Sequence, residues 1–585
     1  MKTNLVNAEV IAVNPDSIKI AINNLNEFLG EHGGLKLGSF LNVSDDDNCQ
    51  LVAVIQNFSL EVNENGKKKY LIDALPLGTI QDGEFIRGGD TLSIPPTSVS
   101  PTKSEDMKVI FESSINEQVK FMFSKLINHQ SNIEIPVDGN KFFNKHIAVV
   151  GSTGSGKSHT ISSLLQHVIN SKDENYSGLN DSHIIIFDLH SEYKSAFPNA
   201  NYLDISNLKL PYWLLNSSEL EEILLDTGER DNYNQASIFR QLVTENKKIH
   251  NEDSEKIFYD SPLKFKIEEI LNALFNIKNE TVHAKTPNTY MLIENDQDQD
   301  SENGLTMTNE EKIRKYFTER FKFKPTKSQS ISKGAYADGT LEKFFLRFDS
   351  KVRDKRLDFL FNSDNYSLTL IDVLKQILGY RDDNKSNITI LDLSGIPFEV
   401  LSITVSLISR LLFDYGYFYK KAFQENTTTT NNNTPFLLVY EEAHKYAPKS
   451  DLVKYRSALQ AIERIAKEGR KYGITLLLAT QRPSEISETI FSQCSNFIAM
   501  RLTNPNDQNY ITRLLPDTLG NMVSKLPTLR AGEALLLGES VTMPLFVKIN
   551  KCDPEPSSND IPYFELWKKE WKEINFSSLS KAWNK

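Results

Sequence analysis

A glycine-rich stretch at 151–158, Gly-Ser-Thr-Gly-Ser-Gly-Lys-Ser, has the residue types and the spacing needed to bind phosphate groups. It fits the pattern G-x-x-x-x-G-K-[ST], in which glycines let backbone N–H groups converge on phosphate oxygens. Lys157 supplies a positive charge for the β- and γ-phosphates, and the Ser158 hydroxyl can ligate Mg²⁺. We therefore predict a site for ATP and Mg²⁺. The residues expected to form it are Gly151, Ser152, Thr153, Gly154, Ser155, Gly156, Lys157, Ser158 and His159.

Two adjacent carboxylates follow a second apolar stretch, at 435–440. A nucleoside triphosphatase needs one carboxylate that holds Mg²⁺ through its water shell and another that polarises the attacking water. The strand type and the order along the chain match this second motif. We assign Glu441 to the metal role and Glu442 to the water-activating role.

Polar side chains also end two further apolar stretches. Gln481 follows the run 474–480, beside the predicted phosphate loop, where it can sense the γ-phosphate. The run 183–187 leads into Asp188, His190 and Glu192, which can all point to the nucleotide, although ordinary loop chemistry explains them equally well. An arginine near such a site can stabilise the charge of the transition state, from the same chain or from a neighbouring subunit.

These side chains require strands that end at one edge of a sheet, so the sequence predicts an α/β fold. Apolar residues at helical spacing after Ser158 place the phosphates at the N-terminus of a helix. We expect a small β-barrel at 1–100, followed at 101–145 by a linker that contains a short helix near 116–126. The nucleotide-binding core is expected in two parts, 146–211 and 381–550, separated by a helical insertion at 212–380 whose segment 279–332 is polar and partly mobile. A tail at 551–585 is expected to brace a neighbour.

The composition and net charge argue against several classes of protein. The 585 residues carry a net charge of −11, which argues against a general basic coat for nucleic acid but permits a local basic channel. Three scattered cysteines suggest neither a disulfide framework nor a zinc site. No apolar run approaches the ~18–20 residues of a membrane span. We expect a cytoplasmic protein with no membrane partner. The basic run 351–356 is either a solvated helix face or a surface for DNA or another subunit.

Together these stretches resemble the HerA family of hexameric DNA translocases, in the larger HerA–FtsK group of RecA-like ATPases. The EEAH and EGRK…ATQRP pair is much more specific to the family than the phosphate loop is. The N-terminal part is similar in pattern to the family's small HAS barrel. The matching motifs, which cover most of 146–550 in family order, are GSTGSGKS at 151–158, DLHSEY at 188–193, LPYWLLN at 210–216, DKRLDFLF at 354–361, ILDLSGIP at 390–397, VYEEAHKYAP at 439–448, EGRKYGITLLLATQRPSEI at 468–486 and GEALLLGE at 532–539.

The resemblance implies a homohexamer with a RecA-like core, ATP between protomers, and double-stranded DNA in the central channel. It also implies an arginine supplied in trans, for which Arg470 matches best and Arg464 and Arg482 are the other candidates. Glu441 stands where many relatives have Asp, although Glu–Glu versions resemble bacterial members. Motors of this family act with a separate effector. That effector is a NurA-like nuclease, or, in antiphage defence, a sirtuin-like NAD-consuming enzyme or another nuclease.

Two other functions compete with a DNA motor. The chain can instead be an ATPase scaffold that assembles and regulates a defence effector without moving DNA, and DNA stimulation of ATP hydrolysis distinguishes the two. A monomeric P-loop enzyme such as a kinase is disfavoured. No acceptor-substrate site is evident, and the Glu441–Glu442 pair suits the activation of water.

Overall fold

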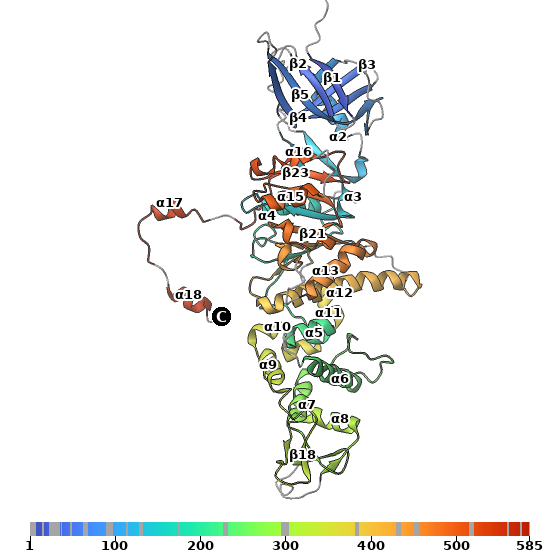
Figure 1. Cartoon of the computed structure of the whole chain (residues 1–585), viewed down its shortest axis with the longest axis vertical. Coiled ribbons are helices and arrows are strands. Elements are labelled where there is room, and N and C mark those ends of the chain that lie inside the picture. The colour runs from blue at the N-terminus through green and yellow to red at the C-terminus, as the bar shows by residue number, and fades with distance from the viewer. Residues whose placement is uncertain are drawn as a thin grey trace, which may run out of the picture.

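The structure is a computed structural model of the 585-residue chain. It has a β-barrel at one end, a large α/β core in the middle and a helical region at the other end (Figure 1). The residues that it describes are 8–14, 17–22, 28, 36, 38–46, 49–62, 68–88, 98–112, 115–127, 133–173, 176–225, 232–293, 304–380, 385–428, 434–449, 456–513, 520–558, 561–573 and 576–583.

The N-terminal part is a closed barrel, as the sequence predicts. Its strands follow the order β2-β1-β7-β3-β4-β5-β6, and an additional pairing of β2 with β5 closes the sheet on itself. Alternate apolar side chains from these strands fill the interior. The strands are β1 (Ala8–Asn14), β2 (Ser17–Ile22), β3 (Phe40–Asp46), β4 (Cys49–Val62), β5 (Lys68–Gln81), β6 (Glu84–Arg87) and β7 (Ser98–Pro101).

The core is built on a sheet of 11 strands in the order β12-β19-β11-β20-β21-β10-β22-β23-β24-β8-β9. The strands from β12 to β22 pair in parallel, and the remaining neighbours pair antiparallel. This confirms the α/β prediction. The core strands are β8 (Lys120–Leu126), β9 (Glu134–Asp138), β10 (His146–Val150), β11 (His183–Asp188), β12 (Asn201–Leu203), β19 (Ile388–Asp392), β20 (Phe436–Tyr440), β21 (Ile474–Thr480), β22 (Cys494–Ala499), β23 (Glu533–Gly538) and β24 (Leu545–Ile549).

Every residue of β10, β20 and β21 is buried, so both faces of the sheet are covered at its centre. Helix α4 (Lys157–Asn170) contacts β10 and β8, and α13 (Ser457–Glu468) contacts β21 and α12 (Phe398–Gln424). Because β21 lies between β10 and β20, the three C-terminal strand ends that carry the predicted site meet at one edge of the sheet.

The prediction of a linker at 101–145, with a helix near 116–126, is wrong. After α2 (Ser104–Glu112) the chain makes one 3-10 turn and then forms β8 (Lys120–Leu126) and β9 (Glu134–Asp138), the outermost strands of the core sheet. Phe121 and Phe123 are buried while Met122 between them is exposed, which is the two-residue period of a strand. Pairing with β24, more than 400 residues away, fixes this segment as a strand.

The insertion at 212–380 is mainly helical, as predicted. The part of 279–332 that the structure describes is folded, whereas the sequence suggested a partly mobile segment. Short strands and α8 (Asn309–Thr318) surround the buried side chains of Tyr290, Tyr316 and Phe317. Residues 294–303 lie outside the described part. The other helices are α5 (Ser217–Leu224), α6 (Asn232–His250), α7 (Ile267–Asn279), α9 (Glu342–Val352), α10 (Asp358–Phe361) and α11 (Leu370–Ile377), and the short strands are β13 (Thr281–His283), β14 (Thr289–Tyr290), β15 (Leu292–Ile293), β16 (Leu305–Thr306), β17 (Lys322–Phe323) and β18 (Ile331–Lys333).

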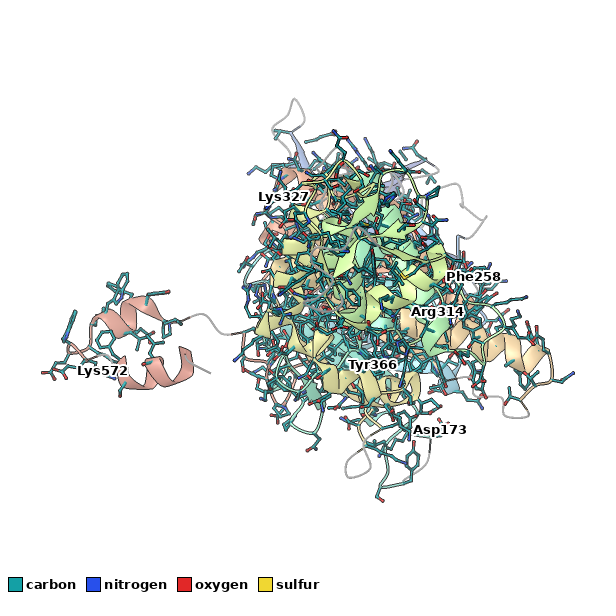
Figure 2. All side chains as sticks on the ribbon, turned by 90° about the horizontal axis from the view of Figure 1, so that it is seen from below. Asp173, Phe258, Arg314, Lys327, Tyr366 and Lys572 are labelled. Atoms are coloured by element: carbon teal, nitrogen blue, oxygen red, sulfur yellow. The ribbon has the colours of Figure 1, made fainter. Side chains whose placement is uncertain are left out.

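The C-terminal tail stands away from the rest of the chain in both whole-molecule views (Figures 1 and 2). It contains α17 (Tyr563–Trp567) and α18 (Phe576–Trp583). Trp567 is 75% exposed and Trp571 is 90% exposed. The bracing role predicted for the tail stays a prediction.

Candidate nucleotide-binding site

The phosphate loop joins the C-terminal end of β10 to the start of α4, as the sequence predicts. Gly154 has a φ of +71° and Gly156 has a φ of +96°, a conformation that glycine adopts without a steric penalty. At Gly151 an added Cβ would lie 2.5 Å from Oγ of Ser155. The loop therefore needs its glycines. It places the N-terminus of a 14-residue helix where an anion is stabilised.

Lys157 points back into this loop, where its Nζ donates a hydrogen bond to the carbonyl oxygen of Gly151 at 2.9 Å. Burial lowers the pKa of its ammonium group, and the charges of Glu442, Glu441 and Glu192 oppose that shift. Lys157, which is half-buried, thus faces three carboxylates at the end of the phosphate loop. In proteins with a phosphate loop, the lysine of the loop binds phosphate oxygens.

Glu441 lies directly after β20 and is 5% exposed. Its Oε2 accepts a hydrogen bond from the backbone N–H of Leu189 at 3.1 Å. Burial, followed by the charges of Asp188 and Glu192, raises the pKa of Glu441 to about 9. Glu441 thus lies close to two other carboxylates, Asp188 and Glu192, whose charges oppose its ionisation. A divalent cation would stabilise its charged form, so the position fits the metal role predicted for Glu441.

Glu442 is held by the side chain of Gln481. Oε1 of Glu442 accepts a hydrogen bond from Nε2 of Gln481 at 2.6 Å, and Oε1 of Gln481 accepts one from Oγ1 of Thr153 at 2.5 Å. Oε2 of Glu442 is buried, lies 3.3 Å from Nδ1 of His444, and makes no hydrogen bond to any described residue. Oε2 is thus the Glu442 oxygen that no described hydrogen-bond donor occupies, which fits the general-base role.

The Ser158 hydroxyl, predicted to ligate Mg²⁺, donates a hydrogen bond to Oε2 of Glu192 at 2.5 Å. Among the described residues no group of three or more His, Cys, Asp or Glu side chains could hold a metal ion by itself. Mg²⁺ in a phosphate-loop site takes a hydroxyl, water molecules and substrate phosphates instead. Ser158 and Glu441 are the residues here that fit it.

Two further side chains lie next to the phosphate loop: His159, which the sequence predicts as a nucleotide-binding residue, and Arg501, which it does not. His159 faces away from the strand ends, with its Nε2 3.7 Å from Glu555 and its Nδ1 3.3 Å from Oγ of Ser558. Sequence reasoning missed Arg501, whose Nη2 donates hydrogen bonds to the carbonyl oxygens of Thr153 at 3.4 Å and Gly154 at 3.2 Å. Arg501 follows β22 at the same edge of the sheet, so the strand-end argument that singled out Gln481 could also have identified Arg501.

Arg470 lies at the opposite end of β21 from Gln481. It belongs to η8 (Gly469–Tyr472), directly before the strand begins, and its charge contributes to the lowered pKa of His146 at the start of β10. A strand rises ~3.3 Å per residue, so the seven residues of β21 separate Arg470 from its own phosphate loop by about 20 Å. The structure does not bring Arg470 to the other site residues of the same chain.

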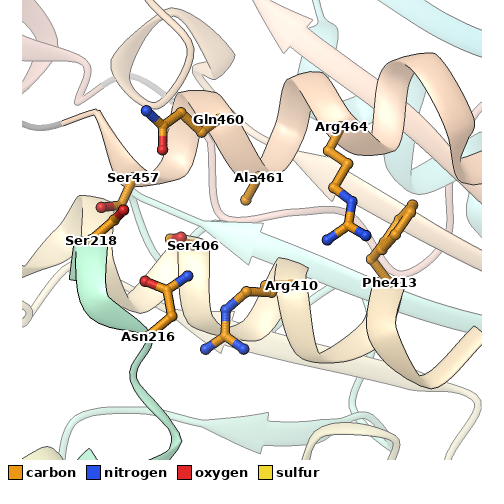
Figure 3. A pocket seen from close by; sticks show the side chains of 9 residues that line it. All are labelled: Asn216, Ser218, Ser406, Arg410, Phe413, Ser457, Gln460, Ala461 and Arg464. Carbon is orange, nitrogen blue, oxygen red and sulfur yellow. The ribbon is translucent and has the colours of Figure 1, made fainter. Parts of the chain in front are cut away.

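Arg464 and Arg482, the other candidates for the arginine in trans, have partners within the chain. Nη1 of Arg464 lies 3.6 Å from Asp414, and its guanidinium group lies 4.2 Å from the ring centre of Phe413. Figure 3 shows Arg464 beside Arg410 and Phe413 in a cavity of about 140 Å³ between α12 and α13. Nη1 of Arg482 donates a hydrogen bond to Glu485 at 2.8 Å.

Three of the four basic side chains in the run 351–356 are paired with acidic side chains of the same chain. This pairing favours a solvated helix face over a surface that presents free charge to DNA. The pairs are Lys351 with Glu399, Arg353 with Asp349 at 3.1 Å, and Arg356 with Asp354 at 2.6 Å.

Known proteins are similar to this chain over most of its length. A family model described as "Helicase HerA, central domain" matches residues 121–412. The DNA double-strand break repair helicase HerA of Saccharolobus solfataricus is 25% identical over 536 residues, which cover 90% of this chain and 86% of that protein. The protein of the same name from Sulfolobus acidocaldarius is 26% identical over 547 residues, covering 92% and 89%. The chain belongs to the HerA family.

This confirms the resemblance inferred from the motifs, and a HerA-family chain with a complete phosphate loop is a P-loop ATPase. Among solved structures, VirB4 of Thermoanaerobacter pseudethanolicus matches with a TM-score of 0.42 at 13% identity, covering 77% of this chain and 98% of that one. The bacterial conjugative coupling protein TrwB matches with a TM-score of 0.44 at 11% identity, covering 79% and 94%. None of the described helices has both the length and the apolar character of a membrane span.

Proposed function

We propose that this HerA-family chain hydrolyses ATP to move double-stranded DNA, as a ring of six identical subunits with a RecA-like core. One observation carries the catalytic part. Three neighbouring strand ends bring together Lys157, Glu442 and Gln481, and hydrogen bonds connect the last two to the phosphate loop. Both relatives are named DNA double-strand break repair helicases, which supports DNA as the molecule that the motor moves.

The side chains divide the reaction among them. Lys157 exchanges the Gly151 carbonyl for the β- and γ-phosphates, and Glu442 uses Oε2, which accepts no hydrogen bond from a described residue, to take a proton from the attacking water. An amide nitrogen has two N–H groups, so Gln481 can donate one to Glu442 and the other to the γ-phosphate. Ser158, and Glu441 through a water molecule, would hold Mg²⁺, which when bound would supply positive charge at the phosphate oxygens.

The location of Arg470 supports a ring. It is too far from the phosphate loop of its own chain to act there, so it serves the site of the neighbouring subunit. The closed N-terminal barrel, which we propose is HAS-like, and the exposed aromatic side chains of the tail supply further surface for subunit contacts. DNA in the central channel would be held mainly through its phosphates, with little sequence preference.

We also propose that the motor acts together with a separate effector protein. It would be a NurA-like nuclease, a sirtuin-like NAD-consuming enzyme or another nuclease, acting with the motor in the cytoplasm in DNA processing or antiphage defence. This part of the proposal rests on the resemblance to the HerA family, whose motors act with a separate effector.

The deciding experiment measures ATP hydrolysis by the purified protein with and without linear double-stranded DNA, together with displacement of a labelled strand or a bound roadblock. DNA-stimulated hydrolysis and ATP-dependent displacement are expected. Hydrolysis that ignores DNA, with no displacement, would instead favour the ATPase scaffold that regulates an effector.

A further inference from the structure

The segment 188–193, Asp-Leu-His-Ser-Glu-Tyr, has no role in the mechanism above, yet it touches the phosphate loop. Oε2 of Glu192 accepts the hydrogen bond of the Ser158 hydroxyl at 2.5 Å. The charge of Glu192 also acts on Lys157 and Glu441. This carboxylate therefore faces the residues proposed to bind the phosphates and the metal, although it lies in the turn after a different strand, β11.

A buried carboxylate fixes the turn that carries Glu192. Asp188 is fully buried, and its Oδ1 accepts hydrogen bonds from the backbone N–H groups of His190 at 3.3 Å and Glu192 at 3.2 Å. Its Oδ2 accepts the N–H of Tyr193 at 3.1 Å. Three backbone donors on one carboxylate leave the turn little freedom. Asp188 thus shapes the turn, and Glu192 is the side chain that the turn presents.

The turn is also held from its other side. Ser191 has a φ of +58°, and its hydroxyl donates a hydrogen bond to Oδ2 of Asp392 at 2.8 Å. The carbonyl oxygen of Glu192 accepts the backbone N–H of Ser557 at 2.8 Å. The backbone at Glu192 is therefore tied to β19 and to the segment after β24. This anchoring keeps its carboxylate in place beside Ser158.

A hydroxyl group that ligates a cation must turn its oxygen lone pairs to the ion and its hydrogen away from it. A carboxylate that accepts this hydrogen orients the hydroxyl and makes its oxygen more basic, as outer-shell partners do for metal ligands in general. We propose that Glu192 is a positioning residue for the Mg²⁺ site: its carboxylate accepts the hydrogen bond of the Ser158 hydroxyl and so directs the lone pairs of the Ser158 oxygen toward the metal. This inference rests on the proposed ATP site and deepens it.

The test measures binding of a fluorescent ADP analogue by the full chain, in EDTA and in saturating MgCl₂. In Glu192→Gln the affinity in EDTA should equal that of the wild type, because the phosphate loop is intact. The gain in affinity that Mg²⁺ gives should shrink about 10–100-fold, the usual cost of losing an outer-shell partner. Glu555→Gln removes the same charge from a side chain that faces His159, and it should keep the wild-type gain.

A double-mutant cycle shows whether Glu192 acts through Ser158. Ser158→Ala removes the hydroxyl, so adding Glu192→Gln to it should change the Mg²⁺ gain by less than about twofold. An unchanged gain in Glu192→Gln, or an equal loss in both backgrounds, would overturn the proposal. Failure of the wild type to bind the analogue in either condition would instead remove the nucleotide site itself.

Discussion

Gln481 connects the proposed general base to the phosphate loop, because its amide bonds Glu442 through Nε2 at 2.6 Å and Thr153 through Oε1 at 2.5 Å. The Thr153 hydroxyl donates to the amide oxygen, and this fixes the nitrogen on the side of Glu442. A movement of Thr153 in the phosphate loop would therefore shift Gln481 and, through it, the proposed general base Glu442.

Lys157→Ala should abolish ATP hydrolysis, because Lys157 is the positive charge that contacts the transferred phosphate. Steady-state phosphate release by the purified protein measures this. Lys172→Ala is the matched control, since Lys172 lies beyond the C-terminal end of α4 and donates to the carbonyl oxygen of Gly178. Turnover at the wild-type rate in Lys157→Ala would refute the assignment of the nucleotide site.

Glu442→Gln should bind ATP normally but hydrolyse it about 10²–10⁴-fold more slowly, the usual cost of losing a general base. Glu441→Gln should mainly weaken binding that depends on Mg²⁺. Nucleotide binding and single-turnover hydrolysis, measured side by side, separate the two effects. If Glu442→Gln turns over normally and Glu441→Gln does not, the two roles are reversed.

Thr153→Val should lower kcat by about fivefold, which corresponds to one neutral hydrogen bond of ~1 kcal/mol. Thr153→Ser keeps the hydroxyl and should restore most of the activity. ATP binding should change little in both variants, because the backbone of the loop is retained. Equal activities for the Val and Ser variants would show that the hydrogen bond to Gln481 does not position the base.

Arg470→Ala should be nearly inactive alone, because we propose that Arg470 completes the site of a neighbour. Mixing it with inactive Glu442→Gln protein should restore part of the ATPase activity. In mixed rings some sites combine an intact Arg470 from one subunit with an intact Glu442 from the next. Native mass spectrometry would verify subunit exchange. Exchange without recovery, or an active monomer, would argue against an arginine in trans.

Arg410→Met should destabilise the fold by about 3–5 kcal/mol, because it leaves the charge of Glu219 buried without its partner. Glu219 is fully buried, and Nη2 of Arg410 lies 2.8 Å from its Oε2, at the cavity of Figure 3. Adding Glu219→Gln should recover much of the loss. Denaturant unfolding measures both variants. Equal stability of Arg410→Met and the wild type would show that this pair contributes nothing.

The amino-acid sequence by itself determined the local chemistry of this protein. The phosphate loop, the Glu441–Glu442 pair and Gln481 each follow an apolar strand, and each can be recognised because a strand end and its polar residues are contiguous in the chain. The closed barrel was also foreseeable, since short alternating stretches separated by turn residues are a local signal.

The tertiary structure decided what depends on partners far apart in the chain. β8 is a strand because it pairs with β24, and its alternating Phe121 and Phe123 were too short a pattern to outweigh a helical reading. The contact of Ser158 with Glu192 and that of Arg501 with the phosphate loop arise only when separate strand ends meet. A local sequence pattern cannot predict these contacts, because the order of strands in a sheet is set by the packing of the whole chain.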